Sequence, residues 1–206
     1  GWQARWRFWW RWRLQLGWRR QFWWRWRLGA MVNWIHQTAR LLRHRWAENL
    51  LRSTASPALL GQLTQAVATS EQRHSGQVRI CIEAGLPASY IWRNASARER
   101  AIAMFSKLRV WDTEHNNGVL IYLLLAEHAI EIVADRGLAR HVPQPVWETL
   151  ASQLSAALRS GHTAEGLLQA LADVSALLEL HSPSDASTAE QPRRNELPDA
   201  PCIASK

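Results

Sequence analysis

The clearest pattern along the chain is a pair of apolar runs separated by a short polar step. Residues 118–125 form the first run, and residues 129–134 form the second. Two short apolar segments joined by a brief polar break are typical of a β-hairpin. Both runs are long enough to form strands, and the first contains no charged residue. This indicates that at least one of the two strands is buried on both faces.

The pairing within this hairpin fixes which polar residues meet at its open end. With the turn at residues 127–128, Asp135 lies opposite residue 120 and Gly137 lies opposite residue 118. The polar loop before the first strand therefore meets the polar residues that follow the second strand. We expect any chemistry at this end of the sheet.

Helical periodicity surrounds the hairpin and one further strand. Residues 78–83 alternate as a strand, Ser56-Pro57 is a typical helix start, and Ser96 with Glu99 forms a capping box. Apolar side chains at helical spacing predict four helices, whose buried stripes include Leu59, Leu63 and Val67; Ala101, Ile102 and Phe105; Trp147, Leu150 and Leu154; and Leu167, Leu171 and Val174.

The resulting order of elements, α-β-α-β-β-α-α, predicts an α/β protein built as a three-layer α/β/α sandwich with a small mixed β-sheet. The first two strands should be parallel, with a right-handed crossover through the helix between them. His74 then lies at the same end of the sheet as Asp112 and Asp135, whereas Glu83 lies at the opposite end.

The charged residues are unevenly distributed along the chain. Eleven of the 25 Lys and Arg residues precede Glu48, and all 17 Asp and Glu residues lie from Glu48 onward. The folded domain is therefore slightly acidic, and nucleic acid is not expected as its partner. We predict a Trp/Arg-rich low-complexity tract at 1–30, a basic amphipathic helix at 31–55, the folded domain at 56–182 and a flexible C-terminal tail at 183–206.

The tract at residues 1–30 contains nine of the fourteen Trp residues and eight Arg residues. This composition suits a membrane interface or stacking on a single-stranded nucleic acid. However, the alternation keeps no helical stripe, and the first methionine is Met31. Our working hypothesis is that the tract is not native, and the alternative is a targeting arm.

The predicted helix at 31–55 combines an apolar stripe that includes Trp46 with basic side chains such as Arg40 and Arg43. Such a helix is typical of docking on an anionic membrane or on a partner protein. A helix that folds back on its own domain has the same pattern. Both interpretations stay open, and residues 1–52 are the expected contact with a membrane surface.

The cysteines and the lengths of the apolar runs indicate the cellular compartment. Cys81 lies within a strand pattern and Cys202 in the tail, so a disulfide is not expected, which suits a reducing compartment. No signal peptide or transmembrane helix is recognised, because the apolar run at 118–126 is shorter than the about 20 residues that span a bilayer. We expect a cytoplasmic protein, with peripheral attachment to the inner membrane as an extension of that expectation.

Candidate chemistry is confined to the two polar segments at the open end of the hairpin. The chain contains no GxSxG, P-loop, HExxH or GxGxxG motif. Oxygen ligands from Asp112, Asn116, Asn117 and Asp135 would suit Ca²⁺ or Mg²⁺, with the carboxyls of the two aspartates side by side, while Arg136 would meet a phosphate. The alternative is ordinary: Asp and Asn form Asx turns, and Asp135-Arg136 is a local ion pair.

Four segments resemble a known family, the TPM domain: Glu71 with Ser75-Gly76 before a strand, the run at 113–122, the run at 132–137, and Asn195–Asp199. The resemblance covers about residues 57–182 and the tail motif. It implies an α/β/α sandwich, divalent-metal binding, a weak acid-phosphatase activity in some members and an accessory role in membrane complexes in others. Glu71, His74 and Arg136 are the residues that we expect to contact a phosphate or a partner.

Two features depart from the family pattern. Many members carry a secretory signal and a transmembrane helix, and many open the first helix with an acidic, glycine-containing segment, where this chain has Ser53–Pro57. One set of metal ligands is therefore missing. We expect a non-enzymatic, metal-binding interaction or assembly module with a protein or membrane complex as partner, because no nucleophile or base is clearly placed. The alternative is a weak metal-assisted acid phosphatase.

Overall fold

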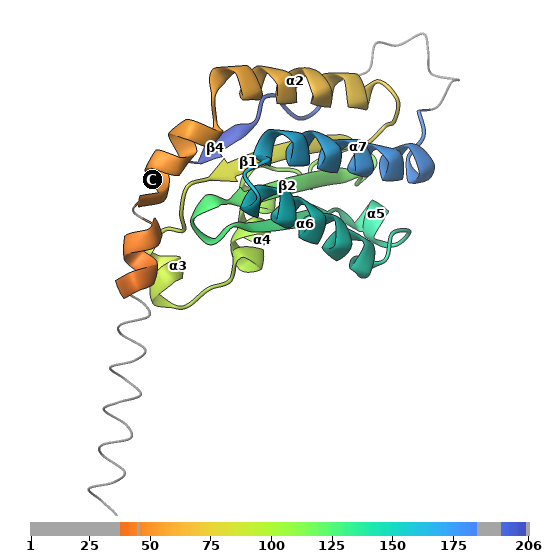
Figure 1. The fold of residues 1–206 in the computed structure, drawn as a ribbon. Coiled ribbons are helices and arrows are strands. Elements are labelled where there is room, and N and C mark those ends of the chain that lie inside the picture. Colours follow the sequence, from red (N-terminus) through yellow and green to blue (C-terminus); the bar gives the residue numbers. More distant parts are fainter. Residues whose placement is uncertain (1–37, 45, 185–194, 205–206) are drawn as a thin grey trace, which may run out of the picture. The chain divides into compact units, whose positions relative to one another are not determined.

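The computed structural model describes residues 38–44, 46–184 and 195–204 (Figure 1). The Trp/Arg tract at 1–30 lies outside these residues, and so does the interval at 185–194.

The chain divides into two compact units, residues 1–42 and residues 43–206. Within the first unit, residues 38–42 are helical. The elements below all belong to the second unit. None of the described helices is long and apolar enough to cross a bilayer.

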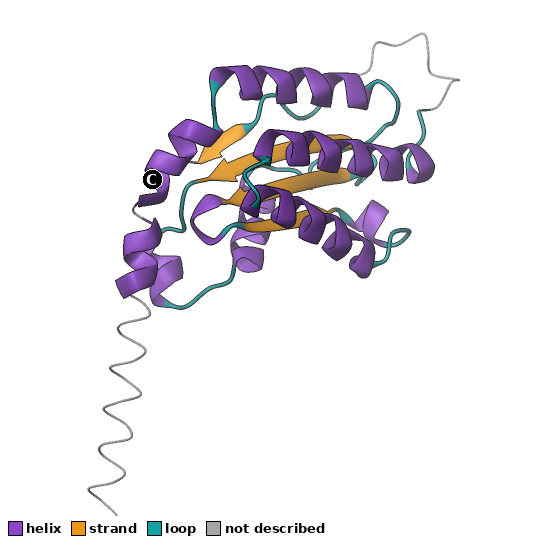
Figure 2. Ribbon diagram, viewed as in Figure 1, coloured by secondary structure: helices purple, strands orange, loops and turns teal. Residues whose placement is uncertain are grey.

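A four-stranded mixed sheet forms the middle of the second unit (Figure 2). Its strands, in the order β3-β2-β1-β4, are β1 (Gln77–Glu83), β2 (Gly118–Leu124), β3 (Ala129–Ala134) and β4 (Cys202–Ala204). β1 is parallel to both β2 and β4, whereas β2 and β3 are antiparallel. The predicted parallel pairing of the first two strands is confirmed, and β2 is buried at every position.

Helices cover both faces of the sheet. The chain contains α2 (Pro57–Glu71), α3 (Ala88–Trp92), α4 (Ala97–Lys107), α5 (Arg136–Ala139), α6 (Gln144–Arg159) and α7 (Thr163–His181), and a 3-10 turn at Leu125–Glu127. The long helices α2, α6 and α7 share one core with one face of the strands, while α4 packs on β2 and β3 from the other side. The predicted three-layer α/β/α sandwich is therefore confirmed.

Alternation along β1 shows how the layers arise. Val78, Ile80 and Ile82 join the core beneath α2 and α7. Glu83, which points to the opposite face because successive side chains alternate, meets Arg100 of α4 instead. The predicted helix starts are also confirmed: Ser56 caps α2, and the capping box of α4 is complete.

The register of the hairpin differs from the prediction by two residues. Asp135 donates its N–H to the carbonyl of Gly118 at 2.9 Å, rather than lying opposite residue 120. The connection is longer than a two-residue turn, because Leu125–Glu127 form a 3-10 turn and His128 takes a left-handed conformation with φ 48°. Leu125, the last residue of the apolar run, therefore belongs to the turn and not to the paired strand.

The prediction of a flexible tail at 183–206 is wrong for residues 195–204. Residues 202–204 form β4 on the outer edge of β1. Gln77 Oε1 accepts the N–H groups of Glu196 and Leu197 at 3.2 and 3.1 Å, and Leu197 is buried. We call residues 195–204 the C-terminal strap, because backbone pairing and side-chain hydrogen bonds hold it along β1.

A buried charge pair joins α4 to the sheet. Arg100 binds both carboxylate oxygens of Glu83, at 2.7 and 2.9 Å, and Tyr122 donates to the same carboxylate at 2.6 Å. The hydrogen bond to Glu83 raises the pKa of Arg100, and burial raises the pKa of the Tyr122 hydroxyl. Both side chains therefore keep their protons at neutral pH.

Replacing Glu83 by Gln should destabilise the domain strongly, because Arg100 would remain charged beneath α4 without its counter-ion. We expect a loss of about 3–5 kcal/mol of unfolding free energy, measured by urea denaturation. The same substitution at Glu179, whose ion pair with Arg73 is largely exposed, should cost less than about 1 kcal/mol. Equal losses in the two variants would contradict this account of the charge pair.

Candidate functional site

The loop between α4 and β2 consists of two consecutive turns. Asp112 donates its N–H to the carbonyl of Arg109 at 2.9 Å, and Asn116 donates to the carbonyl of Thr113 at 3.1 Å. Arg109 and Asn116 take left-handed conformations, with φ of 54° and 52°. The buried Thr113 hydroxyl accepts the N–H of Asn117 at 3.2 Å. These bonds fix the position of Asn117 at the start of β2.

This loop meets the end of β3, as the hairpin pattern predicts. Beside the bond from Asp135 to Gly118, Gly137 donates its N–H to the carbonyl of Asn116 at 3.0 Å. Both glycines are required by close approach rather than by an unusual φ. A Cβ on Gly118 would overlap the carbonyl of Val110, and one on Gly137 would overlap the carbonyl of Asn116.

The carboxylate of Asp135 is buried, with 5% of the residue exposed. One oxygen, Oδ1, accepts the N–H of Arg136 at 2.6 Å and so caps α5. The other oxygen, Oδ2, is fully enclosed and has no hydrogen-bond partner among the described residues. A buried carboxylate oxygen without a hydrogen-bond partner is costly, so Oδ2 is an unusual feature of this end of the sheet.

Asn117 supplies the second buried polar side chain at this end of the sheet. Its amide nitrogen donates to the hydroxyl of Ser75 at 3.2 Å, and Ser75 in turn donates to the carbonyl of Ser182 at 3.0 Å. The amide nitrogen is thus used as a donor, which leaves the amide oxygen as the acceptor atom of this side chain.

The other predicted ligands have a different environment. Asp112 and Asn116 are exposed, and within the described ranges the Asp112 carboxylate forms no hydrogen bond or ion pair. No three His, Cys, Asp or Glu side chains of the described residues gather in a way that would hold a metal ion. Arg136 is also exposed, and the described residues contain no ion pair between it and Asp135. The site is therefore centred on Asp135 and Asn117.

Glu71 and His74 hold the chain between α2 and β1. Glu71 Oε1 accepts the N–H of Val78 at 2.8 Å. His74 is completely buried, and its Nδ1 lies 3.1 Å from the carbonyl of Gly76 while its Nε2 lies 2.9 Å from the hydroxyl of Ser70. Because a carbonyl only accepts, Nδ1 carries a proton, and Nε2 shares a hydrogen bond with the Ser70 hydroxyl. Both ring nitrogens of His74 are thus engaged in holding the fold.

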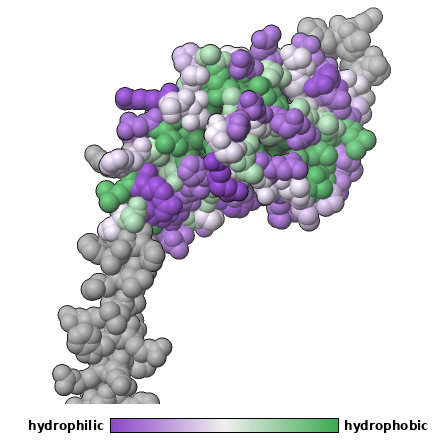
Figure 3. Space-filling model, in the orientation of Figure 1, coloured by the Kyte–Doolittle hydropathy of each residue, from purple (hydrophilic) through white to green (hydrophobic). Residues whose placement is uncertain are grey.

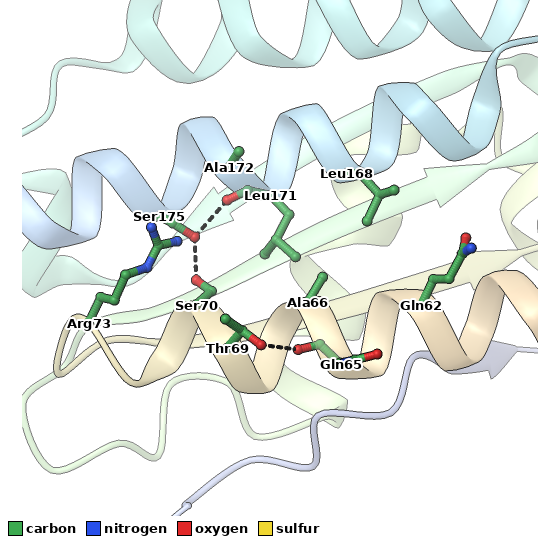
Figure 4. A pocket seen from close by; sticks show the side chains of 10 residues that line it. All are labelled: Gln62, Gln65, Ala66, Thr69, Ser70, Arg73, Leu168, Leu171, Ala172 and Ser175. Atoms are coloured by element: carbon green, nitrogen blue, oxygen red, sulfur yellow. Dashed lines mark hydrogen bonds between the residues drawn. The ribbon is translucent and has the colours of Figure 1, made fainter.

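A groove of about 390 Å³ lies between α2 and α7. Apolar side chains gather there in the space-filling view (Figure 3), and Figure 4 shows the lining side chains. At its end the hydroxyls of Ser70 and Ser175 touch, and Ser175 donates to the carbonyl of Leu171 at 2.8 Å. This network continues from α7 through Ser70 to His74, so it joins the helix pair to the start of β1.

The helical residues 46–54 pack on the domain through a different face from the predicted one. Trp46 is 74% exposed and Leu50 is exposed as well, whereas Ala47 and Leu51 are buried. His44 is also buried: Nδ1 accepts the N–H of Leu86 at 3.0 Å, so Nε2 donates to Glu127 at 3.0 Å. Trp46 and Leu50 therefore face outward, and Arg43, three residues before Trp46, is exposed as well.

Comparison with known proteins places this architecture in a family. The sequence profile of the TPM domain matches residues 53–177. The chain belongs to the TPM domain family.

Two solved structures share the fold of this TPM domain. The BA42 protein of the psychrophilic bacterium Bizionia argentinensis has a TM-score of 0.61 and 21% identity, over 72% of this chain and 94% of that chain. The N-terminal domain of a protein from P. gingivalis has a TM-score of 0.51 and 18% identity, over 63% of this chain and 82% of that one. No curated protein sequence matches the chain. These likenesses concern the fold alone.

Several residues of the TPM domain that build the site were not among the sequence-based candidates. Thr113 and Ser75 fix Asn117 from both sides. Ser175 interrupts the apolar stripe of α7, and a hydroxyl on a buried helix face is the signal that could have revealed its partner Ser70. Gln77 carried no such signal, because its partners in the strap are more than 100 residues away.

Replacing Gly137 by Ala should separate the two segments of the site, because its new methyl group would displace the carbonyl of Asn116. We expect a loss of about 1–3 kcal/mol in unfolding free energy, with faster amide exchange at residues 116–118.

Gly61→Ala provides the matched control, since a Cβ at this helical position meets no atom within 4 Å. That variant should gain up to about 1 kcal/mol through helix propensity. If Gly137→Ala were as stable as Gly61→Ala, the close approach of the two segments would be refuted.

Proposed function

We propose that this TPM domain binds a divalent cation at Asp135 and acts as a non-enzymatic interaction module. The observation that carries the proposal is the buried, unpartnered Oδ2 atom of Asp135. A carboxylate enclosed by protein needs a proton, a hydrogen-bond donor or a cation to offset its lost hydration. A cation satisfies this need and makes the stability of the site depend on the ion.

The segment whose backbone pairs with Asp135 and Gly137 carries hard oxygen donors. Asn117 has an amide oxygen, and the turns at 112–117 contain backbone carbonyls. Ca²⁺ and Mg²⁺ prefer such ligands, and both complete their shells with water. A single buried carboxylate supplies little charge, so the expected affinity is weak. Asp112 and Asn116, which are exposed, would join through water or after movement of the loop.

An interaction module accounts for the site better than a hydrolase does. Both nitrogens of His74 and one oxygen of Glu71 already form hydrogen bonds within the fold, to the Ser70 hydroxyl and to the backbone of Gly76 and Val78. Neither group is thus offered to a substrate as an acid or base. A cation that orders residues 112–117 would instead shape a surface loop for a partner.

Docking of this module to a protein or membrane complex is supported by the outward stripe near the start of the domain. Trp46 and Leu50 are exposed, and so is Arg43. Amphipathic residues of this kind favour a membrane interface or the groove of a partner. Arg43 and Trp46 therefore remain our proposed docking residues, and Arg40, which belongs to the other unit, stays a prediction from the sequence.

One observation favours a second candidate, a weak metal-assisted acid phosphatase. Arg136 is exposed directly beside Asp135, where its planar guanidinium would reach a phosphate bound to the same cation. Asp135 would then hold the cation and Arg136 would orient the ester.

Calorimetric titration with Ca²⁺ and with Mg²⁺ tests the proposal. We expect the unaltered chain to bind one ion with a Kd of roughly 10⁻⁴–10⁻³ M, as in weak oxygen-ligand sites. Asp135→Asn keeps an oxygen that can cap α5 but removes the charge, so it should weaken binding at least about tenfold. Asp173→Asn, which alters a carboxylate bonded to Gln169 on α7, should leave binding unchanged. Binding that survives Asp135→Asn would refute the site.

The same three proteins and a fourth, Arg136→Ala, assayed on a generic phosphomonoester, distinguish the two candidates. The interaction module predicts no metal-dependent turnover by any of them. Turnover that requires Mg²⁺ or Ca²⁺ and disappears in both Asp135→Asn and Arg136→Ala would establish the phosphatase instead.

A further inference from the structure

The two cysteines of the chain lie side by side in the sheet. Cys81 of β1 and Cys202 of β4 are direct partners in the parallel ladder. Adjacent strands lie about 4.8 Å apart, within the range of about 4.4–6.8 Å between Cα atoms that a disulfide spans. Directly paired residues of neighbouring strands also point to the same face. The structure contains no bond between the two thiols.

We propose that Cys81 and Cys202 form an intramolecular disulfide that fastens the C-terminal strap to β1. This inference goes beyond cation binding and does not depend on it. It concerns the opposite end of β1 from Asn117 and Asp135, and it assigns a redox modification to the domain.

The environments of the two thiols set the order of the reaction. Cys202 is half-buried at the edge of the sheet, so an external oxidant can reach it. Cys81 is completely buried, and burial, together with the neighbouring Cys202 and Glu83, raises the pKa of its thiol. Because the thiolate is the nucleophile, Cys81 resists direct oxidation, and modification begins at Cys202.

The oxidant is a small disulfide such as oxidised glutathione. The Cys202 thiolate attacks one sulfur of the oxidant, its S–S bond breaks, and one thiolate leaves with the electron pair and takes up a proton. Cys81 then loses its proton to water and attacks the Cys202 sulfur, which expels the second thiolate. Two cysteine thiols are thereby oxidised to one disulfide, and the oxidant is reduced to two thiols. The second step is the slow one and accelerates as the pH rises.

The strap that this bond would fasten reaches the candidate site. Arg79 donates to the carbonyls of Pro198 and Ala200, the latter at 2.6 Å. Farther along, the carboxylate of Glu196 accepts the N–H of Glu114 at 3.0 Å, within the loop at 112–117. β4 itself has only three paired residues on an outer edge, so it opens readily when reduced. A disulfide would suppress this opening and hold Glu196 against the loop.

Exposure of the full chain to oxidised glutathione, followed by mass analysis of the intact protein and its peptides, tests the proposal. The expected product has lost two hydrogen atoms and yields one linked peptide pair that contains Cys81 and Cys202. Amide exchange at residues 202–204 should slow at least about tenfold on oxidation, with a smaller slowing at Glu114.

Two single variants separate the steps. Cys81→Ala should stop at the glutathione adduct of Cys202, and Cys202→Ser should take up no glutathione, because the remaining thiol is buried. The measurement on the unaltered chain stands without either variant, should one of them fail to fold. A stable adduct on the unaltered chain, a disulfide-linked dimer or an absence of reaction would each overturn the proposal.

Discussion

Two backbone hydrogen bonds carry the arrangement of the candidate site: Asp135 to Gly118, and Gly137 to Asn116. They join the loop that follows α4 to the segment that follows β3. Neither segment is a strand or long helix that would hold itself in place. The buried β2 strand makes the bonds possible, because it fixes the start of the strand under α2, α6 and α7 on one side and α4 on the other. The carboxylate of Asp135 is consequently enclosed rather than solvated. Its oxygen Oδ2 has no hydrogen-bond partner among the described residues, and the proposed cation site rests on this atom.

Hydrogen bonds between polar side chains connect the candidate site to the rest of the domain. Ser175, Ser70 and His74 connect α7 and α2 to the start of β1, and Ser75 connects the same turn to Asn117. On the outer edge, Gln77 and Glu196 connect the strap to β1 and to the loop. The loop at 112–117 is therefore held from the sheet, from the turn after α2 and from the C-terminal segment. An ion, a partner or a change in the strap would each act on the same few turns.

Local patterns in the sequence predicted most of the layers, and the failures share one physical cause. The hairpin, the helix caps and the buried stripes depend on neighbouring residues, so their periodicity is visible in the sequence. The register was wrong because a 3-10 turn and His128 replaced a two-residue turn. β4 was missed because three paired residues carry no pattern, and its attachment depends on Gln77 and Arg79, more than 100 residues away. Likewise, the hydrogen bonds of His44 help to determine which face of residues 46–54 is buried, and its partners Leu86 and Glu127 are remote in sequence.

The most direct test of the cation site is NMR titration with Mn²⁺, whose unpaired electrons broaden nearby amide signals most strongly. A site at Asp135 predicts that broadening begins at Asn117, Gly118 and residues 135–137, and that excess Ca²⁺ reverses it. Broadening that spreads over exposed carboxylates such as Glu148 and Glu165, while residues 117–118 and 135–137 stay sharp, would contradict the account.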